Sequence, residues 1–142
     1  MRRIDRLFAR YGESHRQRVN KAIHWICVPL IMWSALAALW AFTPVAAVTI
    51  AILALGFYAW LSPPLALGML VVTVAMLAPM ASLAPRALLA VAIAVFIGAW
   101  IGQFVGHRIE GRKPSFLEDI VFLLVGPAWL LADVYRRLNV RY

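Results

Sequence analysis

Four long apolar stretches dominate the chain, over residues 23–42, 45–62, 64–84 and 87–106. Each is close to the ~20 residues that an α-helix needs to cross the ~30 Å hydrocarbon core of a bilayer. Short junctions that contain proline separate the stretches. The pattern therefore predicts an all-α fold, an integral membrane bundle of four transmembrane helices in which consecutive helices pack antiparallel.

Residues 1–12 follow the pattern of an amphipathic helix. Apolar side chains recur at the i, i+3, i+4 and i+7 positions of one helical face, namely Ile4, Leu7, Phe8 and Tyr11. Arginines occupy the opposite face, as is typical of a helix that lies on a membrane surface. Gly12 is expected to interrupt this helix, and Ser14 with Gln17 forms a capping box that predicts the start of the next one.

A fifth apolar stretch near the C-terminus is too short to cross a bilayer. It contains Gly126-Pro127, a helix-breaking pair, and it follows a second capping box at Ser115 and Glu118. We therefore expect residues 116–138 to form a broken helix that re-enters the membrane or lies in its plane. A fifth crossing is the alternative, but it would move the last arginines away from the other basic residues.

The charge pattern predicts the orientation of the bundle. Hydrophobic residues make up 64% of the 142 residues, yet the net charge is +8. Seven of the 14 Lys and Arg residues lie in residues 1–21, and six more follow residue 107. Four crossings would leave only Arg86 on the other side, so the positive-inside rule puts both termini in the cytoplasm. Basic residues that flank membrane spans in this way contact the head groups of membrane lipids, so we expect no nucleic-acid partner.

Several classes of protein fit the sequence poorly. The first span is too long for the apolar region of a cleavable signal, so we expect it to stay in the membrane, most simply a bacterial inner membrane. Cys27 is the single cysteine, which excludes an intrachain disulfide. The chain has no glycine-rich phosphate loop or Ser-His-Asp arrangement. Its spans contain no Asp, Glu, Lys or Arg, which argues against an ion or proton transporter.

The candidate chemistry lies at the cytoplasmic end of the bundle. Six polar side chains are expected to gather there: His15, Asn20, His24, Gln103, His107 and Glu110. On the fourth span, Gln103, His107 and Glu110 have the spacing i, i+4, i+7, which places them on one helical face. On the first span, Asn20 and His24 share a face because they are four residues apart. A histidine and a glutamate about one turn apart can both ligate a divalent metal, or the carboxylate can fix the tautomer of the imidazole.

His15 joins this cluster only under one condition. It precedes His24 by nine residues, which in an unbroken helix means ~13 Å of axial rise and opposite faces. Both histidines can bind one ion only if the chain bends between them. Arg16 and Lys21, beside the cluster, are candidates to hold a lipid phosphate or a substrate carboxylate, although plain orientation charge is an equal alternative.

Two motifs resemble those of a known family. The first reads Tyr11-Gly12-Glu13-Ser14-His15, then Asn20-x3-His24-Trp25. The second reads Gly102-Gln103-Phe104-x-Gly106-His107-x2-Glu110-Gly111-Arg112-Lys113-Pro114. Together they resemble the iron(II)-dependent 2-hydroxy fatty acid dioxygenases, a small membrane family of fungi and bacteria.

The resemblance implies an enzyme that uses Fe(II) and O₂ to shorten a 2-hydroxy fatty acid by one carbon. It implies that the iron is bound by His15, His24 and His107. Glu110 would be a fourth ligand or a carboxylate behind the ligands, and we expect it to act in catalysis with Asn20. Gln103, Arg16 and Lys21 are the expected substrate contacts. The alternative is a non-catalytic membrane protein that binds lipid head groups or a partner through the same polar face, and a different lipid substrate is a third possibility.

Overall fold

The computed structural model describes residues 2–142, and the described chain is helical, with no strand. In chain order the elements are α1 (Arg3–Glu13), α2 (Arg18–Phe42), α3 (Pro44–Leu61), α4 (Pro63–Leu77), the 3₁₀ helix η1 (Ala78–Ser82), α5 (Pro85–Glu110), the 3₁₀ helix η2 (Ser115–Leu117) and α6 (Phe122–Arg137). The expected all-α membrane fold is confirmed.

Four helices are long and apolar enough to cross a membrane: α2, α3, α4 together with η1, and α5. They overlap the four predicted stretches, although α2 begins at Arg18, before its stretch, and α5 continues to Glu110, beyond its stretch. Pro44, Pro63 and Pro85 each stand at the first turn of a helix, where the missing N–H would have no partner in the helix. The turn residues that interrupt the hydropathy pattern therefore also start the helices.

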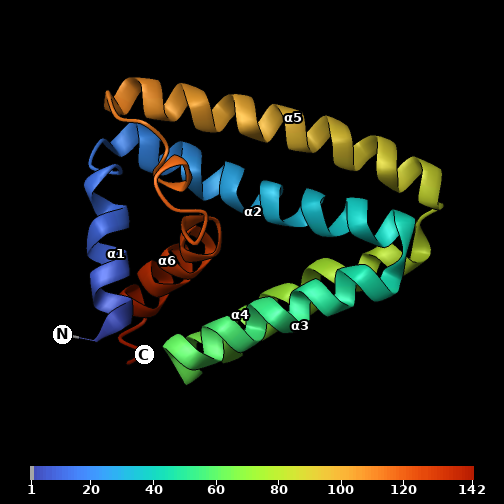
Figure 1. Ribbon diagram of the computed structural model, residues 1–142, viewed down its shortest axis with the longest axis horizontal. Coiled ribbons are helices and arrows are strands. Elements are labelled where there is room, and N and C mark those ends of the chain that lie inside the picture. The colour runs from blue at the N-terminus through green and yellow to red at the C-terminus, as the bar shows by residue number, and fades with distance from the viewer. Residues whose placement is uncertain (1) are drawn as a thin grey trace.

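The bundle has the shape of a V (Figure 1). One arm is the pair α2 and α5, which lie side by side, and the other arm is the pair α3 and α4. The arms meet at the short turns after α2 and before α5, and they diverge at the other end. Helices α1 and α6 fill the space between the diverging ends.

Two apolar clusters hold the arms in place. At the closed end of the V, Leu36 of α2 packs with Ala51 of α3 and with Met80, Leu88 and Ala92. At the open end, α1 and α6 pack on the α3–α4 arm through residues that are almost completely buried: Ile4, Phe8, Tyr11, Tyr58, Leu65, Met69, Phe122, Val125, Ala128 and Ala132. Burial of this apolar surface is what fixes α1 and α6 across the open end.

Small residues bring α2 and α5 close together. A Cβ atom on Gly102 would stand 2.6 Å from Sγ of Cys27, and one on Gly106 would stand 2.5 Å from Oδ1 of Asn20. A Cβ atom on Gly98 would meet nothing within 4 Å. Of the three glycines Gly98, Gly102 and Gly106, two therefore serve the close packing of α5 on α2.

The two predicted capping boxes are wrong. Helix α1 runs through Gly12, and Ser14 caps its C-terminus instead of starting α2, whose N-cap is Gln17. The Ser115 hydroxyl makes no cap bond and lies 2.5 Å from the Ser14 hydroxyl. Both serines therefore use their hydroxyls to join two loops that are far apart in the sequence, a partnership that no local pattern reveals.

The predicted break at Gly126-Pro127 is also wrong. Helix α6 continues through Pro127, and the irregular segment lies earlier, between η2 and Phe122. A Cβ atom on Gly126 would stand 2.9 Å from the Tyr11 hydroxyl oxygen, so the glycine serves the close approach of α1. The 16 residues of α6 rise only ~24 Å, and α6 is not among the helices able to span a membrane.

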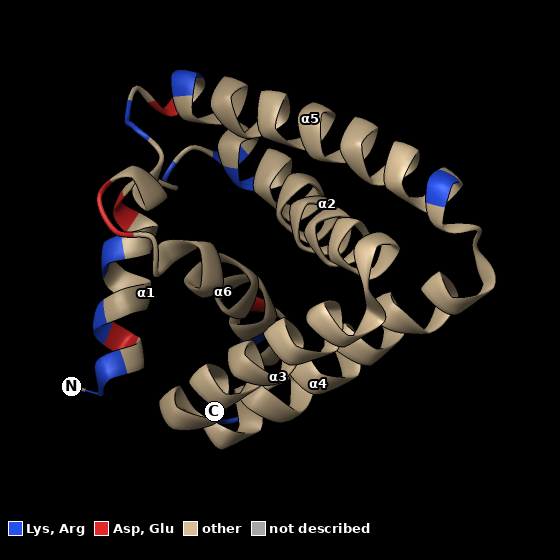
Figure 2. Cartoon of the chain, turned by 45° about the vertical axis from the view of Figure 1, so that its right-hand side comes forward, with Lys and Arg blue, Asp and Glu red and all other residues tan. Residues whose placement is uncertain are grey.

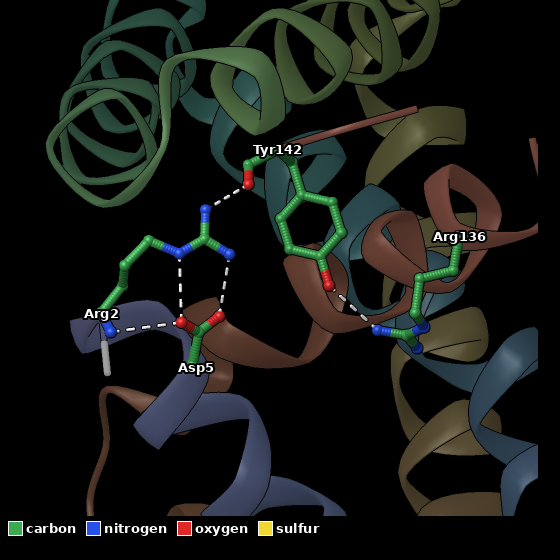
Figure 3. A network of polar contacts seen from close by, with 4 residues as sticks. All are labelled: Arg2, Asp5, Arg136 and Tyr142. Atoms are coloured by element: carbon green, nitrogen blue, oxygen red, sulfur yellow. Dashed lines mark hydrogen bonds and ion pairs between the residues drawn. The ribbon is translucent and has the colours of Figure 1, made fainter. Parts of the chain in front are cut away.

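The basic residues cluster at the open end of the V, and Arg86 stands alone near its closed end (Figure 2). The two chain termini also meet at the open end. Arg2 forms an ion pair with Asp5 at 3.0 Å and donates a hydrogen bond to the backbone carbonyl of Tyr142, whose hydroxyl accepts a hydrogen bond from Arg136 (Figure 3). These contacts are exposed and add little stability, but they place both termini on one side.

Candidate metal centre

Three histidines from three parts of the chain meet between the arms of the V. His15 lies in the turn between α1 and α2, His24 on α2 and His107 near the end of α5. One ring nitrogen of each lies within 4.8 Å of the others, and the side chains are 1%, 1% and 5% exposed. The chain does bend between His15 and His24, as a shared site requires. The bend follows Ser14 and turns the His15 imidazole back toward α2.

Backbone carbonyls fix how two of the rings point. Nδ1 of His15 lies 2.6 Å from the Tyr11 carbonyl oxygen, and Nδ1 of His24 lies 2.9 Å from the Asn20 carbonyl oxygen. Because a carbonyl oxygen only accepts, each Nδ1 must carry the proton and donate it. In the neutral form of each ring the lone pair then lies on Nε2, and this is the form that binds a metal.

Ring nitrogens of the three histidines converge. Nε2 of His24 lies 3.2 Å from Nε2 of His107, while Nε2 of His15 is buried without a hydrogen-bond partner in the described part of the chain. A buried polar atom without a partner costs about 1–3 kcal/mol. Three converging imidazoles of this kind fit a divalent transition metal, which would satisfy all three nitrogens at once.

Burial also favours the neutral form of His15. Removal from water lowers the pKa of His15 below its ordinary value, and this effect outweighs the hydrogen bond to Tyr11 and the nearby Glu110 carboxylate, which both raise it. A neutral imidazole is the ligand form, so the site is prepared for a cation near pH 7.

Glu110 and Asn20 hold the bend that carries His15. The Glu110 carboxylate accepts hydrogen bonds from the backbone N–H groups of Arg16 and Gln17, both at 2.9 Å, and from Nδ2 of Asn20 at 3.1 Å. The same Nδ2 donates to the Ser14 carbonyl oxygen at 3.1 Å. Among the described residues, the group of close candidate ligands consists of the three histidines and does not include Glu110.

A cavity of about 300 Å³ opens beside the histidines. His24, His107 and Gln103 line its polar end, and mainly apolar residues of α2, α3, α5 and α6 line the rest. Gln103 is buried on the same face of α5 as His107, as its spacing predicted. Arg16 and Lys21 are exposed and do not line the cavity.

Sequence reasoning missed the aromatic support of His15. The Tyr11 ring stacks on the His15 ring with centroids 4.1 Å apart, and Trp129 of α6 lies 5.7 Å away. The sequence places Tyr11 on the apolar face of the first helix and at the start of the first motif, and neither pattern predicts its contact with His15. Its position four residues before His15 was the available signal, whereas no pattern in the sequence connects Trp129 to this site.

Fold and site together define a class: a four-span membrane protein with buried histidines at the head of an apolar cavity. The family described as "Mpo1-like: 2-hydroxy-palmitic acid dioxygenase Mpo1-like" matches residues 1–138. The chain therefore belongs to this family, and the resemblance carried by its two motifs is confirmed. Comparisons with curated proteins and with solved structures give no match.

Proposed function

We propose that this protein is an Fe(II)-dependent dioxygenase that shortens a 2-hydroxy fatty acid by one carbon. The observation that carries the proposal is the convergence of three buried imidazoles, two of which line the polar end of an apolar cavity. Backbone carbonyls hold His15 and His24 with Nδ1 as the donor, which leaves Nε2 of these two rings for a metal. The family description, which names a 2-hydroxy-palmitic acid dioxygenase, supports the substrate class and the reaction.

In this proposal His15, His24 and His107 hold the iron. When bound, Fe(II) would supply the oxygen chemistry that no side chain in the cavity can perform. The oxygen-rich head of a 2-hydroxy acid suits the polar end of the cavity, and its alkyl tail suits the apolar remainder.

Each neighbouring residue has a separate task. Gln103 donates a hydrogen bond from its amide to the substrate carboxylate, because the side chain lines the cavity beside His107. Asn20 and Glu110 position His15 through the bend that they hold. Arg16 and Lys21, which are exposed beside the site, attract the anionic head group from the membrane surface.

The location follows from the charge pattern. Four apolar helices fit an integral membrane protein. We propose that the open end of the V faces the cytoplasm of a bacterial inner membrane, with both termini on that side. A lipid-dissolved hydroxy acid then reaches the site from the bilayer.

The reaction is tested with protein purified in mild detergent without oxygen and loaded with Fe(II). The wild type should consume 2-hydroxyhexadecanoic acid only when O₂ is supplied and should release the acid one carbon shorter. A Gln103→Leu variant should raise KM at least ~10-fold, since it loses a hydrogen bond to a charged group. Gln17→Leu, at an exposed position outside the cavity, is the matched control.

A wild-type protein that retains iron but consumes no hydroxy acid would contradict the proposed reaction. It would favour the alternative in which the polar end binds lipid head groups without catalysis.

A further inference from the structure

The cavity is long and narrow. On α2 its lining runs from His24 to Leu36, and 12 residues of helix rise ~18 Å. Since a volume of about 300 Å³ extends over this length, the space is a channel, not a wide chamber. An extended alkyl chain advances about 1.25 Å per carbon for single bonds of ~1.5 Å and angles of ~111°, so ~18 Å holds roughly fourteen carbons.

Polarity is concentrated at one end of this channel. His24, His107 and Gln103 stand at the cytoplasmic end. The deeper lining is apolar apart from Thr73, Tyr58 and the indole N–H of Trp100. The Tyr58 hydroxyl already donates to the Leu124 carbonyl oxygen at 2.9 Å. A ligand with a polar head and an unbranched apolar tail matches this distribution.

The deep end is closed by packed side chains. Leu36 and Ala51 line the channel and also belong to the apolar cluster at the closed end of the V. Behind them, Met80, Leu88 and Ala92 are at most 1% exposed, so no space continues in that direction. Ala54, one turn nearer the metal centre on α3, also lines the channel.

One side of the channel faces lipid. Ile50 of α3 and Phe96 of α5 both line it, yet they are 48% and 40% exposed. In a membrane these side chains contact acyl chains of the bilayer. A tail can therefore enter sideways between α3 and α5 without leaving the hydrocarbon.

We propose that this channel binds the acyl tail of the substrate and that Ala54, Ala51 and Leu36 set the longest tail it accepts. The identity of the head group rests on the proposed function, but the length limit does not require the metal. A tail of about fourteen carbons beyond the hydroxyl-bearing carbon fills the channel, which corresponds to 2-hydroxyhexadecanoic acid.

The limit is tested by moving the end of the channel in both directions. Ala51→Phe should block the deepest part, and Ala54→Phe should block it one turn earlier, ~4.5 Å nearer the metal centre. Leu36→Ala should instead lengthen the channel. Ala59→Phe is the matched control, because Ala59 is exposed on the same helix and does not line the channel.

Binding is measured on metal-free protein by displacement of a fluorescent fatty acid with saturated 2-hydroxy acids of increasing length. The wild type and Ala59→Phe should bind 2-hydroxyhexadecanoic acid best. Ala51→Phe should weaken this binding at least ~10-fold, the loss expected when two or more methylenes are left unburied. Ala54→Phe should prefer an acid shorter by roughly three or four carbons, since one turn of helix spans about that length. Leu36→Ala should shift the preference to longer acids.

The possible failures are distinguishable. If the wild type binds the acids but both phenylalanine variants keep its length profile, the tail leaves sideways past Ile50 and Phe96, and the length limit is wrong. If the profiles shift as expected but the iron-loaded wild type consumes no acid, the length limit stands and the proposed reaction fails.

Discussion

At the scale of single residues, backbone carbonyls decide what the histidines can do. The backbone carbonyl oxygens of Tyr11 and Asn20 each accept a hydrogen bond from an Nδ1–H group, and both acceptors lie four residues before the histidine that they orient. The local helical geometry therefore turns Nε2 of His15 and His24 toward His107. The ligand function of the cluster depends on these two hydrogen bonds as much as on the histidines.

Burial of His15 gives the metal-free protein a pH dependence. The pKa of His15 is lowered in the fold, whereas the unfolded chain titrates near 6.5, so protons bind the unfolded state more readily. The stabilisation is therefore full above pH ~6.5 and is lost as the pH falls toward the folded pKa. The thermal unfolding midpoint should drop between pH ~7.5 and ~5. His15→Gln should show a smaller drop, and equal drops in both proteins would contradict this account.

Glu110 should act through position. Glu110→Gln keeps an acceptor oxygen but removes the charge that receives two backbone N–H groups and the Asn20 amide. We expect a loss of about 1.5–3 kcal/mol in the free energy of unfolding, the range for hydrogen bonds to a charged group. Denaturant titration in detergent measures it, with Glu13→Gln as an exposed control. A stable Glu110→Gln variant that loses activity would instead indicate a direct catalytic role.

At the scale of elements, hydropathy predicted the spans well because a bilayer accepts only continuous apolar helices. Local cap and breaker signals failed near the site. The Ser14 and Ser115 hydroxyls form a hydrogen bond with each other instead of capping helices. Pro127 is tolerated inside α6 because tertiary packing outweighs the local cost of a proline within a helix. The local sequence could not predict the bend at His15, because the carboxylate that holds it belongs to Glu110 at the far end of α5.

The contact between α2 and α5 gives a prediction at this scale. Gly106→Ala should force Asn20 away, because the added Cβ would stand 2.5 Å from Oδ1. The expected loss is about 1–3 kcal/mol of unfolding free energy, as for other overpacked contacts. Gly98→Ala adds the same methyl group where nothing lies within 4 Å and should cost nothing. Chemical unfolding of the two variants compares them, and equal stabilities would show that the α2–α5 spacing is not tight at Gly106.

At the scale of the whole molecule, the basic residues gather at the same end of the V as the candidate metal centre. The open end of the V carries the metal centre, both termini and all the described basic residues except Arg86. The sequence predicted this separation from the placement of charges alone. The V shape and the channel between its arms could not be predicted, because they depend on which apolar faces pack and which are left apart.

The orientation is tested with single added cysteines in intact cells. Arg86→Cys should react with a membrane-impermeant maleimide, whereas Arg141→Cys should react only after the cells are permeabilised. Cys27 is buried and should give little background. Labelling of Arg141→Cys in intact cells would place the open end of the V on the outside.

Iron binding by the wild type and by His15→Ala tests the central claim most directly. The wild type, purified without oxygen, should hold about one Fe(II) per chain through its three imidazoles. His15→Ala should lower the affinity by at least ~100-fold, more than the loss typical of residues behind the ligands. Asp133→Asn, far from the centre in sequence and paired with Arg136 and Arg137, is the control and should keep the iron. Wild-type affinity in His15→Ala would contradict the three-histidine centre.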